Sequence, residues 1–529
     1  DPLREEIATY LAPAGVDTGR IRNTRCQTEI RGYLLGKWLE QANDPAKHLA
    51  TWLWDGAPAG LAKGFGVLDV IFPKVDDKDP QYTLDELVTE LEGFVNYVGV
   101  ETDDDVAKVI QGYHDAGYLK AFDTAQEVEQ FVGGRLVLTK VGSVKKTKVN
   151  DKGESITKTR IIVDSKEART SLAANRTHKS NLPLATTAVR GILGMMATHY
   201  DPETDEDIEL LVTDVSDAFW LVPLAHEERK YFVIRYRGRY YVFLRTAQGS
   251  RGAPLTWATI ASLLARCAQS VLVEQRTQHG RLQVYVDDPL LAIRGTPRVR
   301  RRLAIRFMAV FVVLGVKLAF TKAKLGQDLT WIGVRIVVKP WAVEMSVPKE
   351  KLDEILAYTD SLMSGNLVCL RGVRRIAGKC TNIATFLYMW RPFLLQLWAA
   401  LSTTQSNTPP GYVWTKQIMP TLLWLRAFIR GQQGTVSRLF SYQSMFGVVT
   451  PLVITTDASV YGIGGWISIG STPLAYFTDD LKDADSEVFG HAFGDEKGQQ
   501  AFEGLALLVA VRLWSSLWKS KRLALRLRS

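Results

Sequence analysis

The sequence has few of the features that mark secreted, membrane-bound or zinc-binding proteins. It has four cysteines in 529 residues, and none stands in a C-x-x-C pair or in the spacing of a disulfide framework. Its most apolar stretch, residues 307–320, is interrupted by a lysine and is shorter than the ~20 residues that a helix needs to cross a bilayer. The N-terminus lacks the basic and apolar segments of a secretory leader. We therefore expect an intracellular protein, cytoplasmic or nuclear, without a zinc site, structural disulfides or membrane contact, and we expect residues 307–320 to form a buried helix that leads into a strand.

Internal repeats and low-complexity tracts are missing as well. With 46% hydrophobic and 23% charged residues, the composition is that of ordinary globular domains, and 529 residues are too many for one core. The sequence begins at Asp1 without a methionine and stops within a strand-like run, RLALRLRS. We interpret it as a fragment of a polyprotein.

Positive charge is concentrated in two stretches. The net charge is +9, and between residues 135 and 179 twelve lysines and arginines stand against four acids. Residues 289–327 contain nine basic residues and no acid. A phosphate backbone is the natural partner of such a field, with ordinary surface lysines as the alternative.

Three aspartates carry the strongest chemical signal. In the run VYVDDPL, Asp287 and Asp288 stand side by side at a turn between apolar strand residues, which is costly unless cations neutralise them. Asp214 ends a second apolar strand, ELLVTD, and could face the pair across a sheet. Three converging carboxylates suit two Mg²⁺ ions, with Mn²⁺ as a substitute, in phosphoryl transfer. The alternative is that Asp287 and Asp288 are ordinary solvated residues of a turn.

These aspartates stand in an ordered series of motifs. The series comprises D-x-x-D-A-F (Asp214, Asp217, Ala218, Phe219), a Q-G-x-x-G-x-P turn that begins with Gln248 and Gly249, the Y-V-D-D box that begins with Tyr285, and a W-I-G-V segment (Trp331, Ile332, Gly333). Upstream, TRIIVD contains Arg160. In this order the sequence resembles the reverse transcriptases of retroelements over roughly residues 131–400, although a lone Y-x-D-D would be weak evidence.

The resemblance implies a role for each motif. Asp214 and Asp287 would bridge the metal ions with Asp288 in support, and Lys322, or its neighbour Lys324, would protonate the departing pyrophosphate. Phe219 would exclude a 2′-hydroxyl, unless it is only a core aromatic. Nucleotide contacts would come from Arg160, Asp217, Ala218, Phe219, Gln248 and Gly249, helped by Lys140 or the Lys145/Lys146 pair. Primer and template contacts would come from Tyr285, Trp331, Ile332 and Gly333. The glycines of the Gln248 turn could instead make a plain strand-to-helix connection.

The last part of the sequence resembles a ribonuclease H domain. The run PLVITTDASVYGIGGWI places Asp457 on a strand before a glycine-rich turn, and EGLALLVAVRLW places Glu503 at the start of an apolar helix. Both would be metal ligands. The family's next aspartate would follow the strand that ends at Ser529, so we expect this chain to hydrolyse RNA poorly unless Asp495 or Glu496 replaces it. The alternative is a catalytically silent α/β domain.

The expected fold is α+β, a right-hand polymerase of fingers, palm and thumb followed by a truncated ribonuclease H-like domain. The expected regions are a helical N-terminal region of unknown role (1–130), fingers and palm (131–340), a helical thumb (341–401), a connection (402–448) and the ribonuclease H-like domain (449–529). Within the first region, residues 5–12, 28–43, 84–99 and 104–117 read as amphipathic helices. The expected activity is RNA-directed DNA synthesis from a primer, a template and dNTPs by a retrotransposon enzyme. The rivals are a polymerase that copies RNA into RNA and an inactive or domesticated remnant that only binds nucleic acid.

Overall fold

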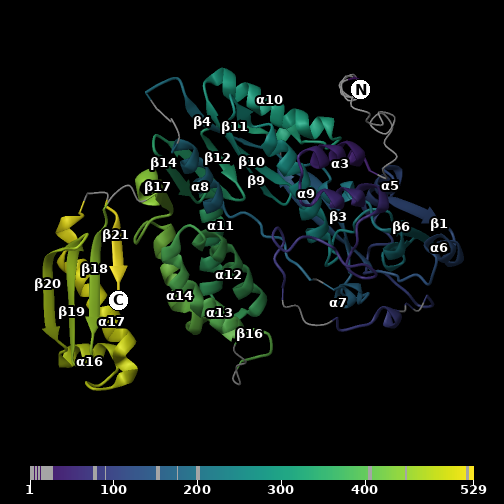
Figure 1. Ribbon diagram of the computed structural model, residues 1–529. Helices are drawn as coiled ribbons and strands as arrows, with labels where there is room; N and C mark the ends of the chain where they lie inside the picture. Colours follow the sequence, from purple (N-terminus) through teal and green to yellow (C-terminus); the bar gives the residue numbers. More distant parts are fainter. Residues whose placement is uncertain are drawn as a thin grey trace. The chain divides into compact units, whose positions relative to one another are not determined.

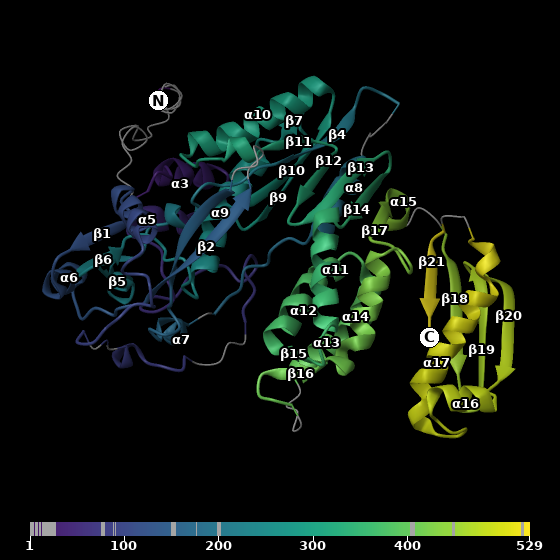
Figure 2. The same ribbon diagram turned by 180° about the vertical axis from the view of Figure 1, so that it is seen from behind.

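The computed structural model describes residues 5, 9, 12, 28–75, 80–87, 89, 91–149, 155–175, 177–197, 203–402, 408–446, 450–519 and 523–529. The chain divides into two compact units. The first comprises Asp1–Met195, His199–Val338 and Met345–Arg438, and the second comprises Leu439–Ser529 with the short segments Met196–Thr198 and Lys339–Glu344. Helices and strands are mixed in both, as Figures 1 and 2 show, which confirms the expected α+β class. No helix in the described parts is long and apolar enough to cross a membrane.

A four-stranded antiparallel sheet lies at the centre of the first unit. Its strand order is β11 (Lys324–Gly326), β4 (Asp207–Val212), β10 (Asp288–Gly295) and β9 (Gly280–Tyr285). Strand residues such as Leu211, Leu291 and Ile293 share one apolar core with helices α9 (Ala253–Ser270) and α10 (Pro297–Val313). Burial of these apolar side chains fixes the register, because a slip of one residue would turn them to the other face.

The described part of the N-terminal region completes this core. Helix α3 (Gly32–Gln41), the 3₁₀ helix Lys47–Thr51 and helix α4 (Trp52–Asp55) place leucine and tryptophan side chains among those of α9 and α10. The amide of Arg31 donates to the carbonyl of Leu314 over 2.8 Å. The Arg266 guanidinium binds both carboxylate oxygens of the buried Asp44. Residues 28–72 are therefore built into the body of the first unit.

A buried carboxylate ties the next residues to the same unit. Glu228 is 0% exposed, and its side chain accepts hydrogen bonds from the amides of Ala59, Leu61 and Lys63 over 2.8, 3.3 and 3.1 Å. Burial raises the pKa of Glu228, whereas these amide donors act in the opposite direction. The side chain thus satisfies the buried amide of Ala59 and two further backbone donors of the same segment.

Two further sheets complete this side of the unit. Strands β1 (Leu119–Phe122), β6 (Arg239–Phe243) and β5 (Val233–Tyr236) form an antiparallel sheet, and β2 (Val141–Val149) pairs with β3 (Ser155–Val163) in a long hairpin. Helix α5 (Asp104–Asp115) contacts β1 and β3, and helix α6 (Ala125–Val132) contacts β1 and β6. Helices α7 (Thr170–Ala173) and α8 (Ala185–Met196) follow β3 in the chain, and the carbonyl of Met195 on α8 accepts a hydrogen bond from Arg294 on β10.

Two expectations about helices are corrected. Among the described residues of 84–99, the one helical segment is the 3₁₀ helix Leu84–Glu86. Gly93 and Gly99 adopt φ angles of +77° and +83° that end helical structure, and Leu91 and Phe94 pack beside a core cluster around Val128. The apolar stretch 307–320 begins as the expected helix α10, but the chain after it makes only a single β-bridge, between Leu318 and Val215. The expected helices at 28–43 and 104–117 are found as α3 and α5, and residues 5–12 lie almost entirely outside the described residues.

The rest of the first unit is mostly helical. The hairpin of β12 (Asp328–Trp331) and β13 (Val334–Lys339) is followed by strand β14 (Ala342–Ser346) and by helices α11 (Lys349–Met363), α12 (Leu370–Ala384), α13 (Arg391–Ser402) and α14 (Thr415–Ile429). Strands β15 (Leu367–Cys369) and β16 (Tyr412–Trp414) pair between these helices. Strand β17 (Ser437–Ser441) begins in the first unit and ends in the second, to which helix α15 (Tyr442–Phe446) belongs.

The second unit has a four-stranded sheet and a long helix. The order is β20 (Thr472–Asp480), β19 (Gly462–Ile469), β18 (Leu452–Ala458) and β21 (Leu525–Arg528), and only the β18–β21 pair is parallel. Helix α17 (Gln499–Leu513) packs Phe502 and Ala506 beside Ile463 in one cluster and Ala510 beside Ile454 in another, and the shorter helix α16 (Asp483–Phe489) follows β20.

Candidate active site

The three predicted aspartates converge at one end of the central sheet. Asp214 follows β4, Asp287 lies in the turn between β9 and β10, and Asp288 begins β10. A backbone hydrogen bond of 2.8 Å from the amide of Val215 to the carbonyl of Asp287 brings the two segments together. One carboxylate oxygen from each of the three residues lies within 4.8 Å of the others. This donor set has the oxygen ligands that Mg²⁺ and Mn²⁺ prefer, and the residues present therefore fit the expected metal ions.

The electrostatics of the three carboxylates favour the binding of cations. Burial raises the pKa of Asp287, the charge of Asp214 raises it further, and the charges of Lys322 and Arg160 oppose this. Burial, followed by the charges of Asp287 and Asp214, raises the pKa of Asp288 to about 6. Lys322 forms an ion pair with Asp214, whose side chain is 16% exposed. Without a strong positive charge, three carboxylates at this separation cannot all ionise at their ordinary pKa.

Two indole groups hold the turn that carries Asp287. Val286 adopts a φ angle of +57°, which is strained for a β-branched residue. The indole nitrogen of Trp257, on α9, donates to the Val286 carbonyl over 2.7 Å, and that of Trp331 donates to the Asp288 carbonyl over 3.0 Å. Both tryptophans are 1% exposed. These hydrogen bonds fix a strained turn in the position that the carboxylates require.

The Trp331 side chain is therefore buried behind the turn, where it also meets Tyr285 edge-on at 6.5 Å between ring centroids. The sequence placed Trp331 among the nucleic-acid contacts, but its side chain is 1% exposed and supports the turn through the hydrogen bond to Asp288. The adjacent residues Ile332 and Gly333 form the partly exposed turn between β12 and β13. Contact of Tyr285 and of this turn with nucleic acid stays a prediction.

The segment after Asp214 forms a compact aromatic turn. Asp217 is exposed and adopts a φ angle of +55°, and it precedes the 3₁₀ helix Ala218–Leu221. Ala218 is buried, and Phe219 is half-buried against the main core. Trp220 stacks on Tyr118 at 5.0 Å between ring centroids, which fixes the direction of the turn. Phe219 is thus partly accessible, and its contact with a nucleotide sugar stays a prediction.

The turn with Gln248 and Gly249 leads into helix α9. Both residues are exposed, so they are accessible to a nucleotide or a template. Gly252, at the end of the same turn, has no room for a side chain, because a Cβ there would lie 2.2 Å from the carbonyl oxygen of Ala59. That glycine is required by packing against the N-terminal region, in line with the alternative of a strand-to-helix connection.

The predicted cations of the β2–β3 hairpin have different surroundings. Arg160 is exposed on β3 and acts on the pKa of Asp287. Lys140 forms an ion pair of 2.8 Å with Glu167, and Lys145 forms ion pairs with two carboxylates of the α5 region. Lys146 is exposed and has no ion pair among the described residues. Outside the hairpin, Lys322 forms an ion pair with Asp214, whereas Lys324 begins β11 and is exposed.

In the second unit, Asp457 and Glu503 come from neighbouring elements. Asp457 is exposed on β18, and Glu503 lies on α17. Gln499 connects the two elements by donating to the carbonyl of Ala458 and, over 3.3 Å, to Glu503. In the described residues no third acidic, histidine or cysteine side chain joins them in a metal-binding group. Asp495 accepts a hydrogen bond from the amide of Lys497 and contacts His491, so its carboxylate is already engaged.

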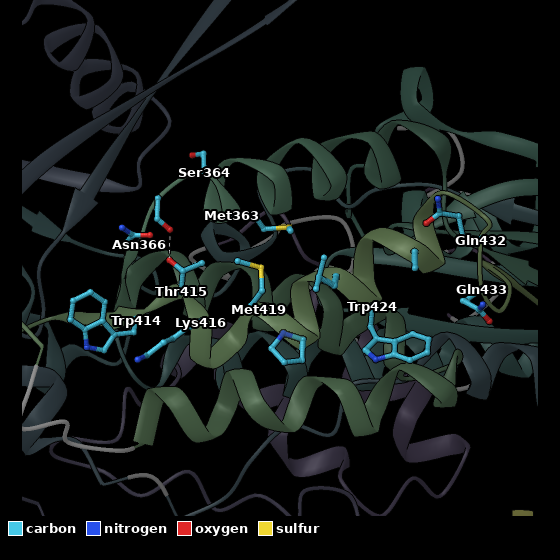
Figure 3. A pocket seen from close by; sticks show the side chains of 14 residues that line it. Met363, Ser364, Asn366, Trp414, Thr415, Lys416, Met419, Trp424, Gln432 and Gln433 are labelled. Atoms are coloured by element: carbon cyan, nitrogen blue, oxygen red, sulfur yellow. Dashed lines mark hydrogen bonds between the residues drawn. The ribbon is translucent and has the colours of Figure 1, made fainter. Parts of the chain in front are cut away.

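A cavity of about 1060 Å³ lies in the helical part of the first unit, at a distance in sequence from every predicted site residue. Figure 3 shows its lining from the end of α11 and from α14, with Met419 and Trp424 among the apolar side chains. None of the three aspartates lines it.

Sequence reasoning missed Trp257 and Glu228. The tryptophan stands in an apolar helical run whose periodicity indicates burial but not a hydrogen bond to the catalytic turn. The glutamate stands in a polar run, HEERK, that reads as surface. No local signal identified either role.

A family model described as reverse transcriptase (RNA-dependent DNA polymerase) matches residues 144–336. Two similar solved structures are the foamy viral protease-reverse transcriptase with dsDNA (16% identity, 90% of this chain and 86% of that chain covered, TM-score 0.44) and its dRH form with ds DNA (15%, 94%, 81% and 0.44). A third is the same viral protein with an RNA/DNA hybrid (14% identity, 94% and 62% covered, TM-score 0.42). No curated protein matches the chain. The family match includes the three aspartates, the Asp217–Phe219 segment and the β12–β13 turn, and residues 144–336 are therefore a reverse transcriptase (RNA-dependent DNA polymerase) domain within this chain.

Proposed function

We propose that this chain is a retrotransposon enzyme that extends a primer with dNTPs on an RNA template by two-metal phosphoryl transfer. The observation that carries the proposal is the convergence of Asp214, Asp287 and Asp288 with oxygen atoms within 4.8 Å of one another. Two divalent ions bound there would activate the primer 3′-hydroxyl and stabilise charge on the triphosphate. The intact triad also opposes a remnant that only binds nucleic acid.

The chain's own residues would have separate tasks in this reaction. Asp214, Asp287 and Asp288 would hold the divalent ions through their carboxylate oxygens. Lys322, which forms an ion pair with Asp214, would donate a proton to the departing pyrophosphate. Phe219 would limit the space at the sugar, which favours dNTPs over ribonucleotides. Arg160 would bind the triphosphate.

An Asp287→Asn variant tests the proposal. We expect it to lose polymerisation on poly(rA)/oligo(dT) with Mg²⁺ and dTTP, while hybrid binding stays within a few fold, because a ligand is lost but the basic surface remains. Asp207→Asn is a matched control on the same strand β4, outside the carboxylate cluster. Retention of more than about a tenth of the activity by Asp287→Asn would contradict the assignment. Binding of the hybrid without synthesis by the unaltered protein would favour the remnant.

We also propose that residues 449–529 are a ribonuclease H-like domain. The support is the motif order together with Glu503 and Asp457 on elements that Gln499 connects. Two carboxylates would hold a second ion weakly, so we expect this chain to cleave RNA in a labelled hybrid slowly. The slow cleavage should be lost with Asp457→Asn. Rapid cleavage by the 529-residue chain that Asp457→Asn leaves unchanged would contradict the assignment of this ligand.

A further inference from the structure

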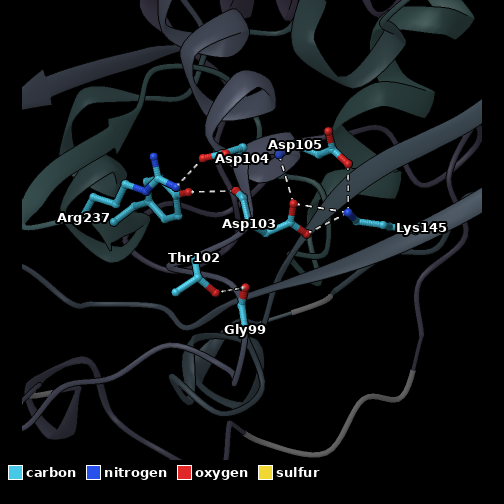
Figure 4. A network of polar contacts seen from close by, with 8 residues as sticks. Gly99, Thr102, Asp103, Asp104, Asp105, Lys145 and Arg237 are labelled. Atoms are coloured by element: carbon cyan, nitrogen blue, oxygen red, sulfur yellow. Dashed lines mark hydrogen bonds and ion pairs between the residues drawn. The ribbon is translucent and has the colours of Figure 1, made fainter.

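Residues 96–105, called the brace from here on, are fastened to the turn between β5 and β6. The side chain of Glu101 accepts a hydrogen bond from the amide of Arg237 over 2.7 Å, and its carbonyl accepts one from the Arg237 guanidinium over 2.9 Å. The same guanidinium forms a 2.9 Å ion pair with Asp104, as Figure 4 shows. One arginine thus holds the brace through three separate contacts.

The other side of the brace is fastened to the base of the β2–β3 hairpin. Asn96 accepts a hydrogen bond from the amide of Val141 over 2.9 Å, and the amide of Tyr97 donates to the carbonyl of Val141 over 3.2 Å. The Tyr97 hydroxyl donates to Asp164, just after β3. Both strands of the hairpin are therefore held where they leave the rest of the unit.

A third attachment reaches the body of the hairpin. The Lys145 ammonium lies 3.1 Å from a carboxylate oxygen of Asp103 and 2.8 Å from one of Asp105 (Figure 4). Asp103 is also the N-cap of α5, because its carboxylate accepts a hydrogen bond from the amide of Asp105 over 3.0 Å. The acceptor is thereby fixed in place, and the Lys145 ammonium lowers the pKa of Asp103.

The register of the hairpin separates Lys145 from the cations that can meet a nucleotide. Arg160 pairs with Val144, Lys158 pairs with Lys146, and Thr159 pairs with Lys145. Because directly opposed residues share a face and neighbours alternate, Lys146 and Arg160 lie on one face and Lys145 on the other. The face that Lys145 occupies is the one that the acidic start of α5 binds.

We propose that the brace sets the position of the β2–β3 hairpin over the active site and that Lys145 is a positioning residue of this attachment rather than a ligand of the triphosphate. The inference rests on the proposed function for its catalytic consequence. Loss of the attachment frees the hairpin to sample other positions, and Arg160 then meets the triphosphate in only part of the molecules. The apparent affinity for dNTP falls in proportion to that population.

Steady-state kinetics with a charge exchange test the proposal. We expect Lys145→Glu and Asp105→Lys each to raise the KM for dTTP about fivefold, which is the size of effect expected when one exposed ion pair is lost. The kcat should stay within about twofold. The double variant, which exchanges the two charges, should return KM to near the starting value. Lys108→Ala, which removes an exposed lysine of α5 without an ion pair in the described chain, should leave KM unchanged. If Lys145 bound the triphosphate itself, the double variant would not recover, and that result would overturn the proposal, as would an unchanged KM in both single variants.

Amide hydrogen exchange separates failure of the brace from failure of the proposed function. In Lys145→Glu, exchange in residues 141–147 and 157–163 should be faster than in the unaltered protein, and the charge exchange should slow it again. This readout needs no catalysis. Altered exchange in an enzyme without polymerase activity would leave the attachment standing and refute the proposed function, whereas unaltered exchange would refute the attachment.

Discussion

Replacing Gly315 with alanine should reveal how firmly the N-terminal region is joined to the central sheet. Gly315 adopts a φ angle of +81° in the turn after α10, and a Cβ there would lie 2.1 Å from the carbonyl oxygen of Glu29. Real atoms cannot approach so closely, so residues 29–31 must move away. That movement breaks the hydrogen bond from the Arg31 amide to Leu314.

The cost can be worked from these contacts. The left-handed conformation costs alanine about 1–2 kcal/mol. Loss of the backbone hydrogen bond adds about 1 kcal/mol, and repacking of the displaced segment adds about 1–3 kcal/mol. We therefore expect Gly315→Ala to lower the free energy of unfolding by roughly 3–6 kcal/mol.

Gly117→Ala is the matched control. Gly117 has a similar φ angle of +71°, but a Cβ added there would have no atom of the described residues within 4 Å, so only the conformational cost of about 1–2 kcal/mol applies. Urea unfolding followed by far-UV circular dichroism measures both variants. Equal destabilisation of the two would refute the idea that residues 29–31 are packed against the turn after α10.

Three further predictions concern single side chains. Phe219→Val should admit ribonucleotides, because the space of the ring becomes free for a 2′-hydroxyl, and an unchanged dNTP/rNTP ratio of kcat/KM would tell against this role. Trp257→Phe should lower kcat severalfold and stability by about 1 kcal/mol, because the strained turn at Val286 loses its indole donor; kinetics equal to those of the unaltered enzyme would show that this hydrogen bond is dispensable. Burial raises the pKa of Asp44, but the hydrogen bonds from Arg266 and from the Ala46 amide outweigh it and leave the pKa lowered. Its contribution to stability is therefore complete above the unfolded pKa of about 3.9 and is lost as pH falls through the folded value. The unfolding free energies of Asp44→Asn and the unaltered protein should therefore differ by about 1–2 kcal/mol at pH 7 and converge as pH falls below the folded pKa.

The sequence by itself determined the elements whose signals are local. Apolar strand runs that end in aspartate predict both the strands and the carboxylates of the Asp214 and Asp287 segments, because a strand end and its side chains are neighbours in the chain. Helices α3, α5 and α11 follow from their periodicity. The expected helix at 84–99 is wrong because its apolar residues pack into a core cluster in a conformation that two glycines with positive φ permit, and periodicity cannot report that competition.

Only the tertiary structure decided which distant residues meet. Nothing in the local sequence indicates that residues 28–72 complete the core of the central sheet, or that Glu228 accepts hydrogen bonds from amides of residues 59–63. Nor does it indicate that Lys145 forms ion pairs with Asp103 and Asp105 while Lys146 lies on the other face of the hairpin. Trp331 reads as a surface residue of a hairpin and is in fact buried behind the catalytic turn. The hydrogen bonds and ion pairs among these residues join positions 40 to 169 apart in the chain, and their pairing is set by how whole elements pack, which the pattern of any single element does not contain.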